Sequence, residues 1–244
     1  MNISYSFFLT LLAGLSTIVG TLIIFLKFKN IQKVIISSLS FAAGVMICIS
    51  ILDLLPESLR LFNLNYNLFL SILLFLIFFI SGSLLILFIN KLVPETDNLY
   101  RVGIISMIGI ILHNIPEGIL TFITSSIDKK LGLEIFIAIS MHNIPEGIAI
   151  SIPIYYSTKS KLKALSLSVI SAISEVLGAL ITYLFLYDYI NDVLIAILLS
   201  IVCGIMSYIS IFELIPESLN YKNKNLFFIF FFIGILFMLI NLII

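Results

Sequence analysis

Two identical six-residue motifs hold the residues of this sequence with the most specific chemistry. His113-Asn-Ile-Pro-Glu117-Gly recurs letter for letter as His142-Asn-Ile-Pro-Glu146-Gly, 29 residues later. In a helix, a histidine and a glutamate four residues apart lie on one face about one turn from each other, so each pair can converge on a point. Imidazole and carboxylate together suit Zn²⁺ and the neighbouring divalent ions of iron, cobalt and manganese, whereas an all-oxygen shell suits Mg²⁺ or Ca²⁺. Two such faces opposed to each other predict a four-ligand metal site.

The same region offers ligands for a second metal position. Asn114 and Asn143 add neutral oxygen ligands beside the histidines, and Glu175 is one more acid in the middle of an apolar run. A second metal that shares Glu117 and Glu146 with these residues is a plausible arrangement. Three carboxylates buried in a membrane with no Lys or Arg at the same depth are very costly as bare anions, so we expect them to be protonated or balanced by a cation.

Proline and glycine recur in both motifs. Pro116 and Pro145 cannot donate the hydrogen bond of a regular helix, so each frees a backbone carbonyl and favours a kink. In lipid a freed carbonyl is tolerated where it lines a cavity, and this favours a polar cavity beside the ligands. Gly118 and Gly147 would permit neighbouring helices to approach closely.

Composition shows which elements must position these residues. Of 244 residues 61% are hydrophobic and 11% charged, with a mean hydropathy of +1.24, far from the roughly 45–50% and 25% of water-soluble domains. The 13 basic and 13 acidic residues balance, so no charge excess points to nucleic acid as a partner. The chain is predicted to be an integral membrane protein that contacts the lipid bilayer.

Eight apolar stretches are long enough to cross the hydrocarbon core, which takes about 20 helical residues. Continuously apolar runs such as 73–80 exclude the alternating pattern of a membrane barrel. We therefore predict an all-α integral membrane protein with eight transmembrane helices in a single domain, 1–244. The predicted spans are 7–26, 34–55, 67–90, 102–124, 133–154, 164–186, 193–215 and 226–243.

Lysine and arginine predict the orientation of the chain. The loops after the first, third, fifth and seventh spans carry 10 of these residues, and the other loops carry 3. The positive-inside rule then places both termini outside the cell. No basic region precedes the first apolar run, so it reads as a first span rather than a cleaved signal peptide.

The sequence also repeats over a longer period. Residues 40–59 match residues 200–219 at an offset of 160, and residues 16–20 match 174–178 more weakly at an offset of 158. Equivalent helices are five spans apart and cross in opposite directions, so the first three and last three spans form an inverted 3+2+3 repeat around the central two. Many secondary transporters use such a repeat for alternating access, and channels are also built this way.

Two further pairs of acids lie toward the ends of spans. Asp53 with Glu57 is predicted at the outer mouth, and Glu213 with Glu217 at the inner mouth. Carboxylates at both ends of a route would concentrate cations and pass them on. The alternative is solvated charge at a helix end, although Asp53 and Glu213 lie a turn deeper than an end requires.

With these motifs the sequence resembles the ZIP (Zrt-, Irt-like) family of divalent metal transporters, most closely its bacterial ZupT-type branch. The match covers almost the whole chain. It is carried by HNIPEG at 113–118 and 142–147, FAAGVM and DLLPES within 41–58, SEVLGA at 174–179 and ELIPES at 213–218.

The resemblance implies a homodimeric importer in the bacterial cytoplasmic membrane. Its cargo is chiefly Zn²⁺, with Fe²⁺, Mn²⁺, Co²⁺ and Cd²⁺ tolerated, and the metal is transported rather than held as a cofactor. Family models also have spans 1, 4, 5 and 6 moving against the other four. Carried over by position, the main site is His113, Glu117, His142 and Glu146, and the second is Asn114, Asn143 and Glu175 with the two shared glutamates. The stretch 91–101 lacks the histidines that some relatives carry there, so outer capture would fall to Asp53 and Glu57.

Two other functions compete with import. An intramembrane metalloenzyme could use the same ligands to activate water, but the sequence has no HExxH motif and leaves no obvious general base. A passive divalent-cation channel would differ in turnover and saturation, which sequence does not reveal.

Overall fold

The computed structural model describes residues 2–94 and 97–243. It confirms eight helices long and apolar enough to cross a membrane. In chain order the spans are α1 (Ile3–Thr21) with the 3₁₀ turn η1 (Leu22–Phe25); α2 (Ile31–Ile49), η2 (Ser50–Leu54) and α3 (Leu55–Asn63); α4 (Leu68–Leu92); α5 (Asn98–Ile127); α6 (Lys129–Thr158); α7 (Lys161–Ile181) with η3 (Thr182–Leu186); α8 (Asp192–Tyr208), η4 (Ile209–Leu214) and α9 (Ile215–Leu219); and α10 (Lys224–Ile243).

Polar residues cap the start of every span. In each case a side-chain oxygen accepts a hydrogen bond from a backbone N–H of the first turn, which satisfies one of the donors that a helix start leaves free. Seven of the eight spans begin one to four residues before the apolar stretches predicted from the sequence, because hydropathy detects only their apolar part, and α4 begins one residue after its predicted start. The capping residues are Asn2, Asn30, Asn67, Asp97, Asp128, Ser160, Asn191 and Asn223.

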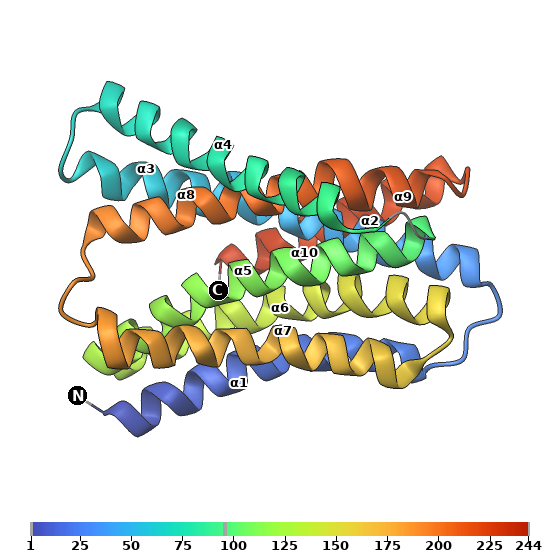
Figure 1. The fold of residues 1–244 in the computed structure, drawn as a ribbon, viewed down its shortest axis with the longest axis horizontal. Helices are drawn as coiled ribbons and strands as arrows, with labels where there is room; N and C mark the ends of the chain where they lie inside the picture. The colour runs from blue at the N-terminus through green and yellow to red at the C-terminus, as the bar shows by residue number, and fades with distance from the viewer. Residues whose placement is uncertain (1, 95–96, 244) are drawn as a thin grey trace.

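The helices form two groups, each packed mainly within itself. One group holds α1, α5, α6 and α7, and the other holds α2, α4, α8 and α10 together with α3 and α9. Figure 1 shows α4, α3 and α8 on one side of the molecule and α5, α6, α7 and α1 on the other. The groups meet mainly where α2 packs on α6 and where α8 and η4 pack on α5.

Glycine contacts bear out the inverted repeat at the level of single residues. Eight glycines each lie against a backbone carbonyl of a neighbouring helix, where an added Cβ would collide with the carbonyl oxygen. The contacts occur in equivalent pairs, at offsets of 158 to 160 or 152 residues between outer spans and 29 between the central two. Gly20 packs against Ile144, as its equivalent Gly178 packs against Ile115, and Gly147 packs against Thr17, as Gly118 packs against Glu175. Likewise Gly44 packs against Phe231, as Gly204 packs against Phe79, and Gly234 packs against Phe41, as Gly82 packs against Ile201.

Two wider helical turns also occupy equivalent places. The π-helical segments η2 and η4 end two residues before Pro56 and Pro216. Proline lacks the N–H that a regular helix needs, and the widened turn accommodates that loss. The two segments carry Asp53 and Glu213, so the acids stand on irregular turns.

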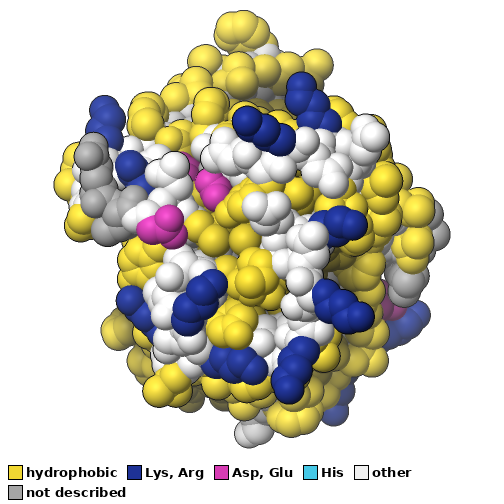
Figure 2. All heavy atoms as spheres, turned by 90° about the vertical axis from the view of Figure 1, so that its right-hand side faces the viewer, with side chains coloured by type: hydrophobic (Ala, Val, Ile, Leu, Met, Phe, Trp, Pro, Cys, Tyr) yellow, Lys and Arg dark blue, Asp and Glu magenta, His cyan; other side chains and the backbone are white. Residues whose placement is uncertain are grey.

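The loops at one end of the molecule carry most of the lysines. Figure 2 views this lysine-rich end, where Lys and Arg side chains surround the centre of the surface. The loops that follow η1, α4, α6 and α9 lie there, and those that follow α3, α5 and η3 lie at the other end, where the chain also begins (Figure 1). The assignment of the lysine-rich end to the cytoplasm stays a prediction from charge.

Replacement of Gly178 by valine tests the close contact between α7 and α5. The new side chain would meet the Ile115 carbonyl, and overpacking of this kind costs about 1–3 kcal/mol. At about 2–4 °C per kcal/mol, we expect a thermal unfolding midpoint several degrees below that of the parent protein in detergent. Ile173→Val on the exposed face of α7 is the control, and equal midpoints for the two variants would contradict the packing described.

Candidate metal centre

The two repeated motifs face each other in the middle of α5 and α6. His142 Nε2 lies 2.6 Å from Glu117 Oε1, and His113 Nε2 lies 3.1 Å from the same oxygen. Ligand atoms of these three residues all lie within 4.8 Å of one another. The helical spacing of His and Glu thus brings side chains of both helices to one point, and this arrangement can hold a divalent cation.

Glu146 completes the set from the other side of His113. Its Oε1 lies 3.1 Å from His113 Nε2, and the residue is only 1% exposed. It lies outside the tightest group of ligand atoms, which comprises His113, Glu117 and His142. The structure therefore gathers all four predicted residues, with Glu146 nearer to His113 than to the centre of the cluster.

Several buried polar atoms of this cluster have no hydrogen bond among the described residues. They include Glu117 Oε2, both carboxylate oxygens of Glu146, and the Nδ1 atoms of His113 and His142. A buried polar atom without a partner is costly, and a buried carboxylate more so. A divalent cation would supply the missing partner for the carboxylate oxygens of Glu117 and Glu146.

The asparagines beside the histidines are anchored through their amide nitrogens. Asn114 Nδ2 donates to the Ser171 carbonyl at 3.0 Å, and Asn143 Nδ2 donates to the Ala13 carbonyl at 3.1 Å and to Glu175 Oε2 at 2.9 Å. Both asparagine Oδ1 atoms and Glu175 Oε1 are buried without a hydrogen bond among the described residues. The free atoms are thus the oxygens, which are the ligands that a second cation position needs.

Glycines set the positions of the flanking helices. Gly118 lies against the backbone of Glu175 in α7, and Gly147 lies against the backbone of Thr17 in α1. The predicted close approach therefore occurs, but each glycine receives a flanking helix rather than the opposite motif. Gly118 brings the backbone of Glu175 directly against the motif of α5.

A cavity of about 460 Å³ leads to the cluster from the end opposite the lysines. His113, Glu117 and His142 lie at its inner part, and Asp53 and Glu57 lie along its wall. The predicted pair of outer acids thus shares one cavity with the histidine–glutamate cluster. Glu57 also pairs with Arg60 at 2.6 Å.

Glu213 and Glu217 lie toward the lysine-rich end, outside this cavity. Glu213 Oε1 accepts a hydrogen bond from Asn90 Nδ2 at 2.6 Å. Glu217 accepts a hydrogen bond from Asn220 at 3.1 Å and lines a separate cavity of about 480 Å³ with Asp97 and Asn98. The predicted acids are thus present near both ends, and neither of these two cavities is lined by both pairs.

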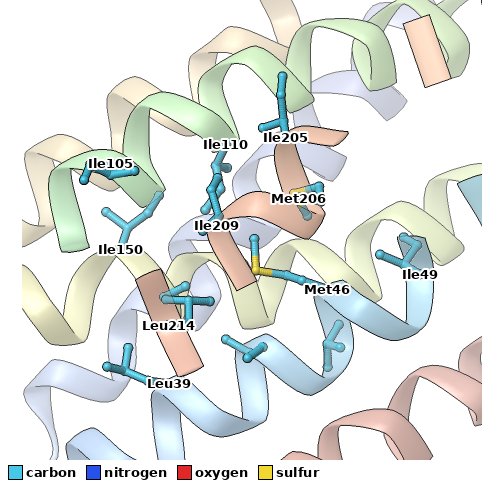
Figure 3. Packing of buried hydrophobic residues seen from close by; sticks show 14 of the residues in the cluster. Leu39, Met46, Ile49, Ile105, Ile110, Ile150, Ile205, Met206, Ile209 and Leu214 are labelled. Atoms are coloured by element: carbon cyan, nitrogen blue, oxygen red, sulfur yellow. The ribbon is translucent and has the colours of Figure 1, made fainter. Parts of the chain in front are cut away.

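Buried apolar side chains pack where the two helix groups meet, on the lysine-rich side of the cluster. Figure 3 shows this packing, with side chains from α2, α5, α6, α8 and η4 in contact between the two helix groups. Those that are at most 1% exposed include Leu39, Met46, Ile105, Ile110, Ile150, Ile205, Ile209 and Leu214. We call this set the apolar seal, because it lies between the cluster and the lysine-rich end.

Sequence patterns missed three residues near the path. Glu134 and Asn241 line the cavity, and Asn90 contacts Glu213. Glu134 lies four residues after Lys130 near the start of α6, so its sequence position indicated a charge at the end of a span. Asn90 and Asn241 each lie near the end of an otherwise apolar span, and a polar residue at such a position indicates a polar partner or a cavity.

Comparison with known proteins gives consistent matches. The family model described as ZIP Zinc transporter matches residues 94–242, more than half of the chain. The zinc transporter ZupT of Chlorobium chlorochromatii is 38% identical over 92% of this chain and 91% of its own length. ZupT of Streptococcus mutans is 40% identical over 91% of this chain and 90% of its own, and ZupT of Campylobacter jejuni is 38% identical over 89% and 88%.

Replacement of His142 tests the cluster directly. We expect His142→Ala to weaken Zn²⁺ binding by about 100-fold or more, beyond the roughly 10–100-fold that loss of a partner outside the ligand shell costs. Calorimetric titration of the purified protein measures this, with Ser126→Ala near the end of α5 as the control. Unchanged zinc affinity in His142→Ala would exclude the cluster as the binding site.

Proposed function

This chain belongs to the ZIP zinc transporter family, and from that premise we propose that it imports divalent metal, chiefly Zn²⁺, into the cytoplasm. It is a multi-pass membrane transporter and not an enzyme, which excludes the alternative of an intramembrane metalloenzyme. The metal is the transported substrate rather than a cofactor. Zinc as the main cargo is supported by the relatives, which are named zinc transporters.

The proposed cargo site lies on α5, α6 and α7. His113, Glu117, His142 and Glu146 would hold the first cation, since their nitrogen and oxygen atoms converge and several lack other partners. Asn114, Asn143 and Glu175 with the two glutamates would hold a second. A nitrogen and oxygen ligand set without thiolate also suits Fe²⁺, Mn²⁺ and Co²⁺, and we include these ions and Cd²⁺ in the proposed cargo range.

The observation that carries this proposal is the one-sided access to the cluster. The cavity reaches His113, Glu117 and His142 from one end, while the apolar seal packs toward the other. A passive channel would conduct through a continuous path, whereas a carrier is open to one side at a time. The arrangement favours a carrier whose site faces the end opposite the lysines.

The inverted repeat indicates how the site could face the other end. Residues that line the open cavity have repeat equivalents at an offset of 160 residues between the spans of α2 and α8, or of 29 between α5 and α6. The equivalents include Glu213 and several seal residues. The correspondences are Asp53 with Glu213, Ile49 with Ile209, Leu54 with Leu214, Leu199 with Leu39, Glu134 with Ile105 and Ile139 with Ile110.

These equivalents describe a second state. If the group of α1, α5, α6 and α7 shifts against the other helices, the seal residues would line a cavity at the lysine-rich end, and the present cavity would close. Glu213 and Glu217 would then line the open cavity, as Asp53 and Glu57 line it in the structure described. Cargo would enter past one pair of acids and leave past the other.

Cellular placement and assembly complete the proposal. The excess of lysines at one end supports a cytoplasmic location of that end and external termini. We propose the bacterial cytoplasmic membrane as the site of function, with residues 1–244 forming one transport domain. A homodimer is proposed by family resemblance.

Uptake into liposomes tests the function. Purified protein is reconstituted around a zinc-responsive dye, and external Zn²⁺ should raise the signal until it saturates. Glu117→Ala with Glu146→Ala should reduce uptake to the level of empty liposomes, because two cargo carboxylates are lost.

The matched control also removes two acids. Asp188→Ala with Asp192→Ala changes exposed residues at a loop and should preserve uptake. Equal uptake by the two double variants would refute the proposed site, and no zinc signal from the parent protein would refute import.

A further inference from the structure

A chain of hydrogen bonds ties three helices together at the sealed end. Arg101 of α5 donates from Nε to Asn90 Oδ1 at 3.0 Å and from Nη2 to the Asn90 backbone carbonyl at 2.9 Å. Asn90, near the end of α4, donates from Nδ2 to Glu213 Oε1 at 2.6 Å and to Tyr208 Oη at 3.4 Å. The Asn90 amide therefore bridges a guanidinium on one helix group and a carboxylate on the other.

This bridge is one of few polar links between the groups. Within the described part of the chain, side-chain hydrogen bonds cross from one group to the other at two places, Arg101 to Asn90 and Asn241 to the Ala138 carbonyl. The first lies at the sealed end and the second lines the open cavity. Most of the remaining contact between the groups is apolar packing, which is non-directional.

The bridge also breaks the symmetry of the repeat. The repeat equivalent of Asn90, at an offset of 152 residues, is Leu242, and the equivalent of Arg101, at an offset of 29, is Lys130. The leucine side chain has no polar atom to form such a bridge, and Lys130 instead lies 3.8 Å from Glu134 within its own helix. A bridge from a guanidinium through an asparagine to a carboxylate is thus built at the sealed end only, whereas at the open end Asn241 donates to a backbone carbonyl.

We propose that Asn90 and Arg101 form a latch that keeps the lysine-rich end shut and positions Glu213 while the cluster faces the opposite end. The inference rests on the proposed function, in which the cluster is open to one end of the molecule at a time. In the closed state Arg101 supplies the positive charge opposite the acid, and its repulsion disfavours a divalent cation in the exit. When α5 moves away, the bonds between Arg101 and Asn90 break and the positive charge leaves the neighbourhood of Glu213, whose carboxylate can then meet the departing metal.

Thiol labelling tests the latch without any metal. The two cysteines, both free and buried, are first replaced by alanine. Ser106→Cys then reports on the sealed end, because Ser106 is fully buried and is the repeat equivalent of Ile135, which lines the open cavity. Ile137→Cys reports on that open cavity, which it lines in an exposed position.

Asn90→Leu should move the two reporters in opposite directions. We expect labelling of Ser106→Cys to rise by about tenfold, the equilibrium shift that the loss of one hydrogen bond to a charged group produces, and labelling of Ile137→Cys to fall. Arg101→Gln removes the positive charge and should act in the same direction, while Arg101→Lys, which keeps a positively charged donor, should stay close to the parent. Ser81→Leu on the exposed face of α4 is the control for substitution in that helix.

The opposed change separates a latch from a general loss of packing. A parallel rise at both reporters, or no change at either in Asn90→Leu and Arg101→Gln, overturns the latch. Failure of the proposed import would show differently, as absent zinc uptake with the labelling differences intact.

Discussion

The burial of three carboxylates within membrane spans is the constraint on which the rest of the structure depends. Glu117, Glu146 and Glu175 are at most 8% exposed, and among the described residues no Lys or Arg pairs with them. A buried anion without a partner is so costly that such a site persists only when something else meets its charge. Two histidines meet part of it, and the oxygens left without hydrogen bonds are those that a metal would bind.

The helix packing follows from the need to hold these groups at one depth. Glycines in both motifs bring α7 and α1 against α5 and α6, and the asparagines tie their amides to the backbones of the same flanking helices. The site and its walls thus form one packed group. The second group supplies Asp53 on one side of the site and Glu213 on the other. The repeat makes each group nearly symmetric within itself, but Thr17 of α1 occupies the position that Glu175 occupies in α7, so only one side of the site carries the additional acid.

Much of the fold could be predicted because lipid imposes strong rules. Hydropathy predicted the eight spans, and the offset of 160 residues between 40–59 and 200–219 predicted the inverted repeat. The four-residue spacing of His113 and Glu117, and of His142 and Glu146, predicted that both pairs would converge. The widened turns at η2 and η4 were not predicted, although Pro56 and Pro216 indicate in retrospect where a regular turn fails.

Spacing along a helix does not reveal how two helices are rotated against each other or which gap between them is open. For this reason the sequence did not place Glu134 and Asn241 in the cavity, nor show that the site faces one end only. The bridge from Arg101 through Asn90 to Glu213 joins three elements, and no periodic pattern marks such a contact.

X-ray absorption at the zinc edge tests most directly whether a cation meets the buried charges of this cluster. On the zinc-loaded protein we expect a first shell of nitrogen and oxygen at about 2.0–2.2 Å, with the outer scattering of two imidazoles, and loss of one imidazole in His142→Ala. A shell containing sulfur at about 2.3 Å, or a spectrum without imidazole scattering, would contradict the proposed site.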